Sequence, residues 1–176
     1  MGTPKYFEDY KVGERFGSPG RTITEAHVII HAGNTGDMFD LQMNAEYART
    51  TPFGQRVVHG PLVYSIMEGL INLIPGLRSP QTNICYYGLD KMRIPRPVFI
   101  GDTISVERRV IDKREKSDIG GLIKFEDVVT NQRQEVVMVC ETLIYVRYRN
   151  PGAFRGKGPT EKAGTRSAPP CNPPEE

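Results

Sequence analysis

The fold is decided by residues 60–75, which read Gly60-Pro61-Leu62-Val63-Tyr64-Ser65-Ile66-Met67-Glu68-Gly69-Leu70-Ile71-Asn72-Leu73-Ile74-Pro75. Apolar side chains recur at positions 62, 63, 66, 67, 70, 71 and 74, which is the spacing of a helix with two adjacent apolar stripes. Pro61 suits a first helical turn, and Pro75 followed by Gly76 ends a helix. Because most of its surface is apolar, we expect this helix to be buried at the centre of the domain.

The surrounding pattern is that of strands. Four long strands are expected after the helix, at residues 83–95, 102–110, 122–130 and 135–147, since these segments alternate in polarity or are rich in β-branched side chains. Before the helix, a strand is expected at residues 14–23 and a helix at 24–34, with Thr24 as its N-cap. The inner positions of that first helix are expected to be His27, Val28, Ile30 and His31. Long antiparallel strands around one buried helix make an α+β domain.

The chain has 176 residues, of which we assign 1–150 to a single domain and 151–176 to a tail. The tail contains six prolines and four glycines, and Phe154 is its one large apolar side chain. Such a segment buries too little apolar surface to offset the entropy lost on ordering.

Charge and composition exclude several classes of protein. The 23 basic and 21 acidic side chains leave a net charge of +2 with no cluster of either sign, which argues against nucleic acid as a partner. No apolar segment approaches the length of a membrane span, and no signal peptide is evident. The cysteines Cys85, Cys140 and Cys171 are few and far apart, so neither disulfides nor a zinc site is expected. We therefore expect a cytoplasmic protein without a metal.

The segment before the central helix carries a set of motifs in a fixed order. They are Thr35-Gly36-Asp37, then Gln42, Tyr47-Ala48 and His59-Gly60. Together with Arg93-Ile94-Pro95-Arg96-Pro97 and Gly101-Asp102-Thr103, this set resembles the MaoC-like family of (R)-specific enoyl-CoA hydratases and dehydratases. The resemblance covers roughly residues 5–147.

The resemblance implies a single hot-dog domain, in which a curved antiparallel sheet wraps a long helix, and assembly into a homodimer or a dimer of dimers. It also implies a lyase of fatty acid metabolism that adds water to a trans-2-enoyl-CoA, or removes it from a 3-hydroxyacyl-CoA. In active members an Asp and a His hold the water, while N–H groups at the start of the central helix polarise the thioester carbonyl. The expected catalytic set here is Asp37, Gln42, His59 and Gly60. No cofactor is implied, since CoA is part of the substrate.

Gln42 departs from the family pattern, because a histidine is usual at that position. Histidine exchanges a proton near neutral pH and glutamine does not. Three hypotheses stay open: a variant with one carboxylate, recruitment of another histidine among His27, His31 and His59, or loss of the reaction. The corresponding alternatives in function are an acyl-CoA thioesterase and a non-catalytic acyl-CoA-binding protein.

Each candidate residue also has a purely structural interpretation. Asp37 can cap its own backbone after Gly36, His59 can be a buried hydrogen-bonding partner at the helix entry, and His31 is expected to be a core or interface side chain. Asp40 is expected to face solvent. The expected substrate contacts are Arg56 and Arg93, whose guanidinium groups match the phosphates of CoA. Pro61 and Leu62 at the helix start complete this set. The alternative for the two arginines is that they are solvated surface charges.

Overall fold

The computed structural model describes residues 2–152, so nearly all of the expected C-terminal tail lies outside the described residues. The elements are a 3-10 helix η1 (Phe7–Asp9), strands β1 (Arg15–Gly17) and β2 (Arg21–Thr22), helices α1 (Glu25–Thr35), α2 (Asp40–Met43), α3 (Ala45–Arg49) and α4 (Gly60–Ile71), and strands β3 (Asn83–Arg93), β4 (Thr103–Ser117), β5 (Gly120–Thr130) and β6 (Val136–Arg147). The order expected from the sequence, with one apolar helix followed by four long strands, is confirmed.

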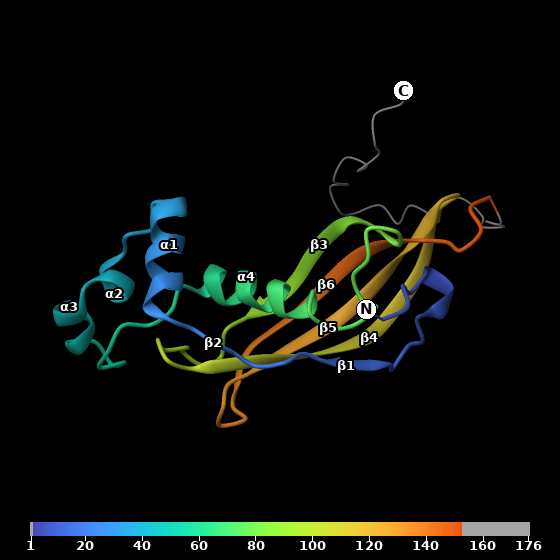
Figure 1. The fold of residues 1–176 in the computed structure, drawn as a ribbon. Helices are drawn as coiled ribbons and strands as arrows, with labels where there is room; N and C mark the ends of the chain where they lie inside the picture. Colours follow the sequence, from blue (N-terminus) through green and yellow to red (C-terminus); the bar gives the residue numbers. More distant parts are fainter. Residues whose placement is uncertain (1, 153–176) are drawn as a thin grey trace.

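The strands form one antiparallel sheet that curves around α4 (Figure 1). Its order is β1-β4-β5-β6-β3, and β2 pairs with the far end of β4. Register shifts interrupt the pairing of β4 with β5 and of β3 with β6. Such irregularities bend a strand and increase its twist, which helps the sheet to wrap the helix.

Helix α4 supplies the centre of the core. Met67, Leu70 and Ile71 are at most 1% exposed and pack with inward side chains of β4, β5 and β6. The helix ends at Ile71, four residues before Pro75, where the N–H groups of Leu73 and Ile74 bond to carbonyls three residues earlier and tighten the chain into turns. The prediction of a buried central helix is therefore correct, although its predicted C-terminal end was too late.

The N-terminal region differs from the prediction in two respects. The single strand expected at residues 14–23 is divided into β1 and β2 around Pro19, which lacks an N–H for pairing. In α1 the buried face consists of Val28 and Ala32, whereas Ile30 is 61% exposed. The prediction of Ile30 and His27 as inner positions was wrong, because the inward positions repeat every four residues from Val28. His27 instead accepts a hydrogen bond at Nδ1 from the N–H of the N-cap Thr24 (2.9 Å).

The loop expected between the two main helices contains the one-turn helices α2 and α3. Asn44 lies between them, and its side chain accepts a hydrogen bond from the N–H of Tyr47 at 3.1 Å, as N-cap residues do. With α1 they form a group of helices next to the N-terminal end of α4 (Figure 1). One-turn helices have almost no stability of their own, so their formation depends on this packing.

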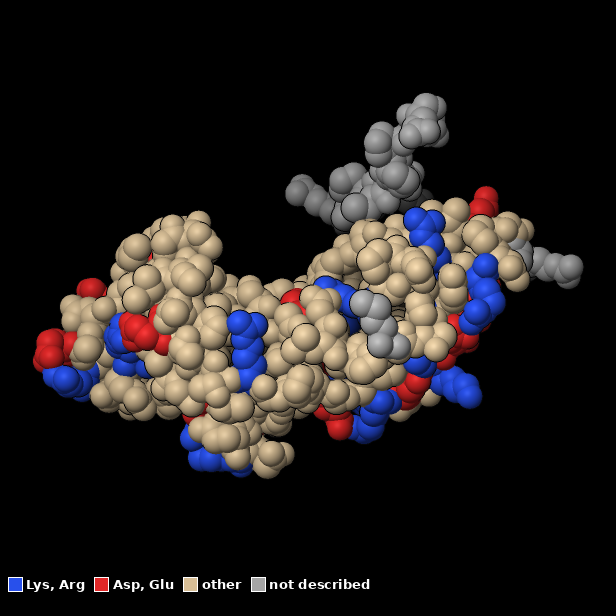
Figure 2. All heavy atoms as spheres, viewed as in Figure 1, with Lys and Arg blue, Asp and Glu red and all other residues tan. Residues whose placement is uncertain are grey.

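The surface agrees with the charge pattern of the sequence. On the face drawn in Figure 2, acidic and basic side chains are interspersed and no continuous area carries one sign. Among residues 2–152 no helix has the length and apolar character needed to cross a membrane. The same residues contain no group of three or more His, Cys, Asp or Glu side chains placed to hold a metal ion.

Candidate active site

The start of α4 is held in place by the segment between β3 and β4 and by α2. The N–H of Val58 donates to the carbonyl of Val98 at 2.7 Å, and Val57 forms an isolated bridge with Phe99. Val57 also donates to the carbonyl of Leu41 at 3.4 Å. These contacts fix His59, the N-cap of α4, between the sheet and the group of three helices.

Asp37 lies beside His59. Gly36 ends α1 in the left-handed region (φ 75°) and turns the chain so that Asp37 faces the helix entry. The Nε2 atom of His59 lies 3.0 Å from the backbone oxygen of Asp37 and 4.0 Å from its Oδ2 atom. The other carboxylate oxygen, Oδ1, accepts from the N–H of Phe39 at 3.4 Å, so a local capping role and a role beside His59 coexist in the same side chain.

The contacts of His59 define its tautomer. A carbonyl oxygen can only accept a hydrogen bond, so Nε2 of His59 carries the proton that it donates to Asp37. In the neutral ring Nδ1 is then an acceptor, and it is buried without a hydrogen-bonding partner among the described residues. His59 is only 1% exposed. Buried polar atoms without partners are rare in folded proteins, and this one marks a place where a ligand can bind.

Gln42 has a second atom of this kind. Its Oε1 atom is buried and has no hydrogen-bonding partner within residues 2–152. Gln42 belongs to α2, and its neighbour Leu41 is the residue that bonds to Val57, two positions before His59. The structure therefore brings Gln42 to the same end of α4 as Asp37 and His59.

Gly60 is the first residue of α4. The N–H groups of the first helical turn have no acceptor within the helix, and Pro61 has no N–H, so Gly60 and Leu62 carry the donors that point outward here. A β-carbon at Gly60 would lie 2.5 Å from Cδ1 of Ile94. The absence of a side chain at Gly60 therefore makes room for Ile94, and the helix dipole favours an acceptor oxygen at the N–H groups of this turn.

The remaining histidines occupy different places. His31, on α1, lies with its ring centroid 4.8 Å from that of His59, at an angle of 51° between the ring planes. His27 is at the other end of α1, where it caps the helix and contacts Arg21 at 3.1 Å. Of the two, only His31 is close to the candidate site.

The four expected substrate contacts differ in their exposure. Arg56 forms a two-point ion pair with the carboxylate of Glu25, in which Nη1 lies 3.0 Å from Oε1. Arg93 is exposed, and its guanidinium donates to the neighbouring carbonyl of Met92 at 2.7 Å. Pro61 is exposed, whereas the side chain of Leu62 is 7% exposed and belongs to the core. Asp40 is exposed, as expected.

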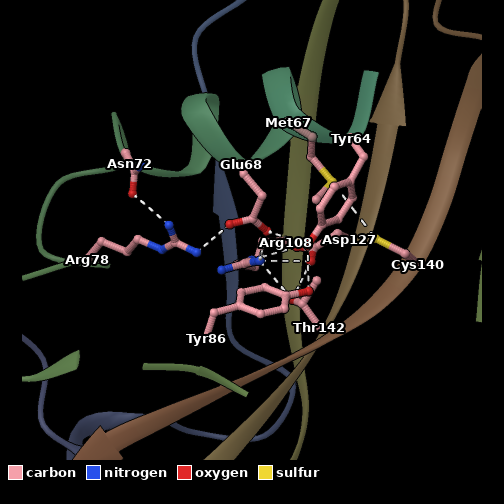
Figure 3. Close-up of polar contacts among 10 residues, drawn as sticks. All are labelled: Tyr64, Met67, Glu68, Asn72, Arg78, Tyr86, Arg108, Asp127, Cys140 and Thr142. Atoms are coloured by element: carbon pink, nitrogen blue, oxygen red, sulfur yellow. Dashed lines mark hydrogen bonds and ion pairs between the residues drawn. The ribbon is translucent and has the colours of Figure 1, made fainter. Parts of the chain in front are cut away.

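A buried polar cluster under α4 was missed by the sequence interpretation (Figure 3). Arg108 on β4 donates from Nε and Nη2 to the two carboxylate oxygens of Asp127 on β5, at 2.6 and 2.8 Å. Thr142 on β6 donates to Asp127 at 2.6 Å and accepts from Arg108 at 2.8 Å. Arg108 and Asp127 are at most 1% exposed. Desolvation alone lowers the pKa of Arg108, but the hydrogen bonds and the charge of Asp127 outweigh it, so the pKa is raised. The sequence contained one signal for this cluster: β4 and β5, which are neighbours, each have a charged residue at an inward position.

This cluster continues upward to α4. Glu68 lies 3.9 Å from Arg108 and forms a close ion pair with Arg78, which also donates to the side chain of Asn72 at 3.2 Å. Tyr64, one turn earlier on α4, donates to the hydroxyl of Tyr86 on β3 at 2.5 Å. Partial burial raises the pKa of Tyr86 to about 12, so both hydroxyl groups keep their protons at neutral pH.

Comparison with known proteins agrees with this geometry. The family described as MaoC like domain matches residues 9–132. The chain belongs to the MaoC-like family. Within this family it is 30% identical over 134 residues to an (R)-specific enoyl-CoA hydratase of Rhodospirillum rubrum, with 71% of this chain and 89% of that protein covered. It is 36% identical over 118 residues to Protein MaoC of Klebsiella aerogenes, of which the match covers 34%, so this MaoC-like chain spans about a third of that relative.

Solved structures confirm the fold. The Archaeoglobus monoamine oxidase regulatory protein superimposes with a TM-score of 0.80 at 33% identity, over 84% of this chain and 97% of that one. A Mycobacterium tuberculosis protein with a double hot-dog fold matches with a TM-score of 0.73 at 19% identity, over 94% of this chain and 53% of that one. The expected hot-dog architecture is therefore correct, as is the resemblance to the MaoC-like family.

Proposed function

We propose that this protein hydrates a trans-2-enoyl-CoA, or dehydrates the corresponding 3-hydroxyacyl-CoA, at the N-terminal end of α4. The observation that carries the proposal is the meeting of Asp37, the buried His59 and the N–H of Gly60 at one place. The (R)-specific hydratases of Rhodospirillum rubrum and Aeromonas caviae, both 30% identical to this chain, support the reaction class.

The chemistry requires one base and one oxyanion site. In the hydration direction Asp37 takes a proton from the water while the water oxygen bonds to C3 of the substrate. The electron pair of the C2–C3 double bond shifts toward the thioester oxygen, which forms an enolate. The N–H of Gly60 stabilises this enolate. Asp37 then returns the proton to C2, so the sum of the steps is the addition of one water. Oε1 of Gln42 accepts a hydrogen bond from the water and orients it, while His59 holds the backbone of Asp37. No cofactor takes part, and CoA enters as part of the substrate.

The proposal is tested with crotonyl-CoA, by following the loss of enoyl absorbance. A release of free thiol without that loss would favour the thioesterase, in which Asp37 directs water to the carbonyl carbon. Saturable binding of CoA esters with neither reaction would favour the non-catalytic protein.

Replacement of Gln42 with histidine is expected to raise kcat for hydration, because an imidazole beside Asp37 supplies the second proton-transfer group that glutamine lacks. General acid–base groups contribute about 10²- to 10⁴-fold, so a gain of about 10²-fold, the lower end of that range, is expected. Gln42→Asn, which shortens the amide without adding a proton carrier, is the control. A Gln42→His variant no faster than wild type would show that the glutamine is already the better partner here.

We also propose that the protein forms a homodimer through β3. This strand is at the edge of the sheet and carries the exposed apolar side chains Tyr87 and Leu89. A long apolar edge strand is a pairing surface for another chain.

Leu89→Arg is therefore expected to shift the sedimentation coefficient from dimer to monomer. Val12→Arg, which alters an apolar side chain that is 62% exposed and lies before β1, should leave it unchanged. Equal behaviour of the two variants would exclude the β3 interface.

A further inference from the structure

One flank of α4 is polar along its whole length. Gly60, Tyr64, Glu68 and Asn72 are spaced four residues apart, so they lie on the same side of the helix. The first three are half-buried, and Asn72 is exposed. This flank faces β3 and the segment after it, because Gly60 lies against Ile94 and Tyr64 against Tyr86.

An acyl group that runs from Gly60 along this side of α4 would pass over the polar flank. This step rests on the proposed function, which places the thioester oxygen at the N–H of Gly60. With a helical rise of about 1.5 Å per residue, Tyr64 lies roughly 6 Å and Glu68 roughly 12 Å further along the axis. An extended acyl chain of four or five carbons that follows this flank reaches Tyr64 and Tyr86, and a longer one reaches Glu68.

The groups met there are hydrogen-bond donors with capacity left over. Tyr64 donates its proton to Tyr86 at 2.5 Å rather than to the more distant carboxylate of Glu68 at 3.5 Å, so the proton of Tyr86 is available to a ligand. Arg78 uses single N–H groups toward Glu68 and Asn72, and a guanidinium has five. Arg78 and Asn83 line two adjoining cavities of about 290 and 160 Å³ at the far end of the flank, the second of which also includes Tyr86.

The cluster underneath does not compete for these donors. Arg108, Asp127 and Thr142 satisfy one another, and the charge of Arg78 is matched by that of Glu68. An alkyl chain laid on this surface would remove water from Tyr86, Glu68 and Arg78 without replacing its hydrogen bonds, which is unfavourable. An oxygen atom at the end of a short acyl group would instead accept a hydrogen bond.

We propose that the protein selects short acyl thioesters with an oxygen-bearing group at the far end of the acyl chain, a carboxylate or a hydroxyl, and that Tyr86 with Tyr64 is the specificity-determining pair.

The test measures binding of saturated thioesters by calorimetry, because these cannot be hydrated. Succinyl-CoA, 4-hydroxybutyryl-CoA and butyryl-CoA have equal acyl length, and octanoyl-CoA is the long apolar probe. We expect at least one oxygen-bearing ester to bind about tenfold more tightly than butyryl-CoA, the value of one good hydrogen bond. Which of the two it is distinguishes the carboxylate from the hydroxyl.

Tyr86→Phe should abolish that preference by weakening the binding of the oxygen-bearing ester to the level of butyryl-CoA. Tyr87→Phe, which removes a hydroxyl from the next residue of β3, is the matched control and should retain the preference. Octanoyl-CoA binding as tightly as the polar esters, or an equal loss for all esters in Tyr86→Phe, would overturn the inference. Absence of hydration with every enoyl-CoA, with the binding preference intact, would instead overturn only the proposed reaction.

Discussion

Asp37→Asn is expected to lower kcat for enoyl-CoA hydration by about 10²- to 10⁴-fold, the contribution typical of a general base. Asparagine keeps the shape of the side chain, and its amide oxygen can still accept from the N–H of Phe39 as Oδ1 does now. It cannot take a proton from water. The affinity for a saturated acyl-CoA should therefore change little while the rate falls. Stopped-flow or steady-state measurement of the enoyl absorbance separates these two quantities.

Asp40→Asn is the matched control, because Asp40 follows three residues later and its side chain is exposed. The same charge is removed from the same segment, so a purely electrostatic or folding effect would appear in both variants. An Asp37→Asn enzyme that hydrates at the wild-type rate would remove Asp37 from the mechanism and leave His59 and His31 as the remaining bases near Gly60.

Asp127→Ala is expected to lower the free energy of unfolding by about 3–5 kcal/mol, the cost of removing one partner from a buried ion pair. Arg108 would keep its charge in a position that is 1% exposed, with Glu68 as the nearest remaining carboxylate at 3.9 Å. Thr142 would lose the acceptor of its hydroxyl proton. Urea unfolding monitored by circular dichroism measures the loss.

The neighbouring residues of the same two strands provide the control. Arg109 and Glu126 also form an ion pair, with Nη2 and Oε2 2.7 Å apart, but their side chains are 37% and 40% exposed. Exposed pairs contribute about 0–1 kcal/mol, so Glu126→Ala should have at most a small effect. Similar losses in the two variants would show that the burial of the Arg108–Asp127 pair has no special energetic role.

Much of the fold could be predicted because the signals are local. The spacing of apolar residues identified α4 and its inner face, and the strand expected at residues 102–110 is present as part of β4, with Ile104, Val106, Arg108 and Val110 buried. The first helix was placed within a residue of its bounds, yet Ile30 was assigned to the wrong side. A short helix can have apolar residues on two different sides. Only the packing of Val28 and Ala32 in the folded protein shows which side of this helix is buried.

The candidate site was predictable in part. Asp37, Gln42, His59 and Gly60 were selected by their order and spacing, and the structure brings them to one end of α4. The roles of these four residues stay predictions until the variants are measured. The contact of His31 with His59 and the hydrogen bond between Tyr64 and Tyr86 had no signal in the sequence. The helices α2 and α3 were also missed, because a single turn leaves no measurable periodicity.

The sequence by itself determined which segments are helices and strands, and which of their faces are apolar, because these properties depend on residues that are close together in the chain. Only the tertiary structure decided which polar groups meet. Arg108 and Asp127 are 19 residues apart in sequence and Tyr64 and Tyr86 are 22 apart, so their contacts depend on strand register and on the placement of α4 over the sheet. The same nonlocal packing leaves Nδ1 of His59 and Oε1 of Gln42 buried without a hydrogen-bonding partner in residues 2–152, and it aligns the polar flank of the helix with the start of the proposed active site.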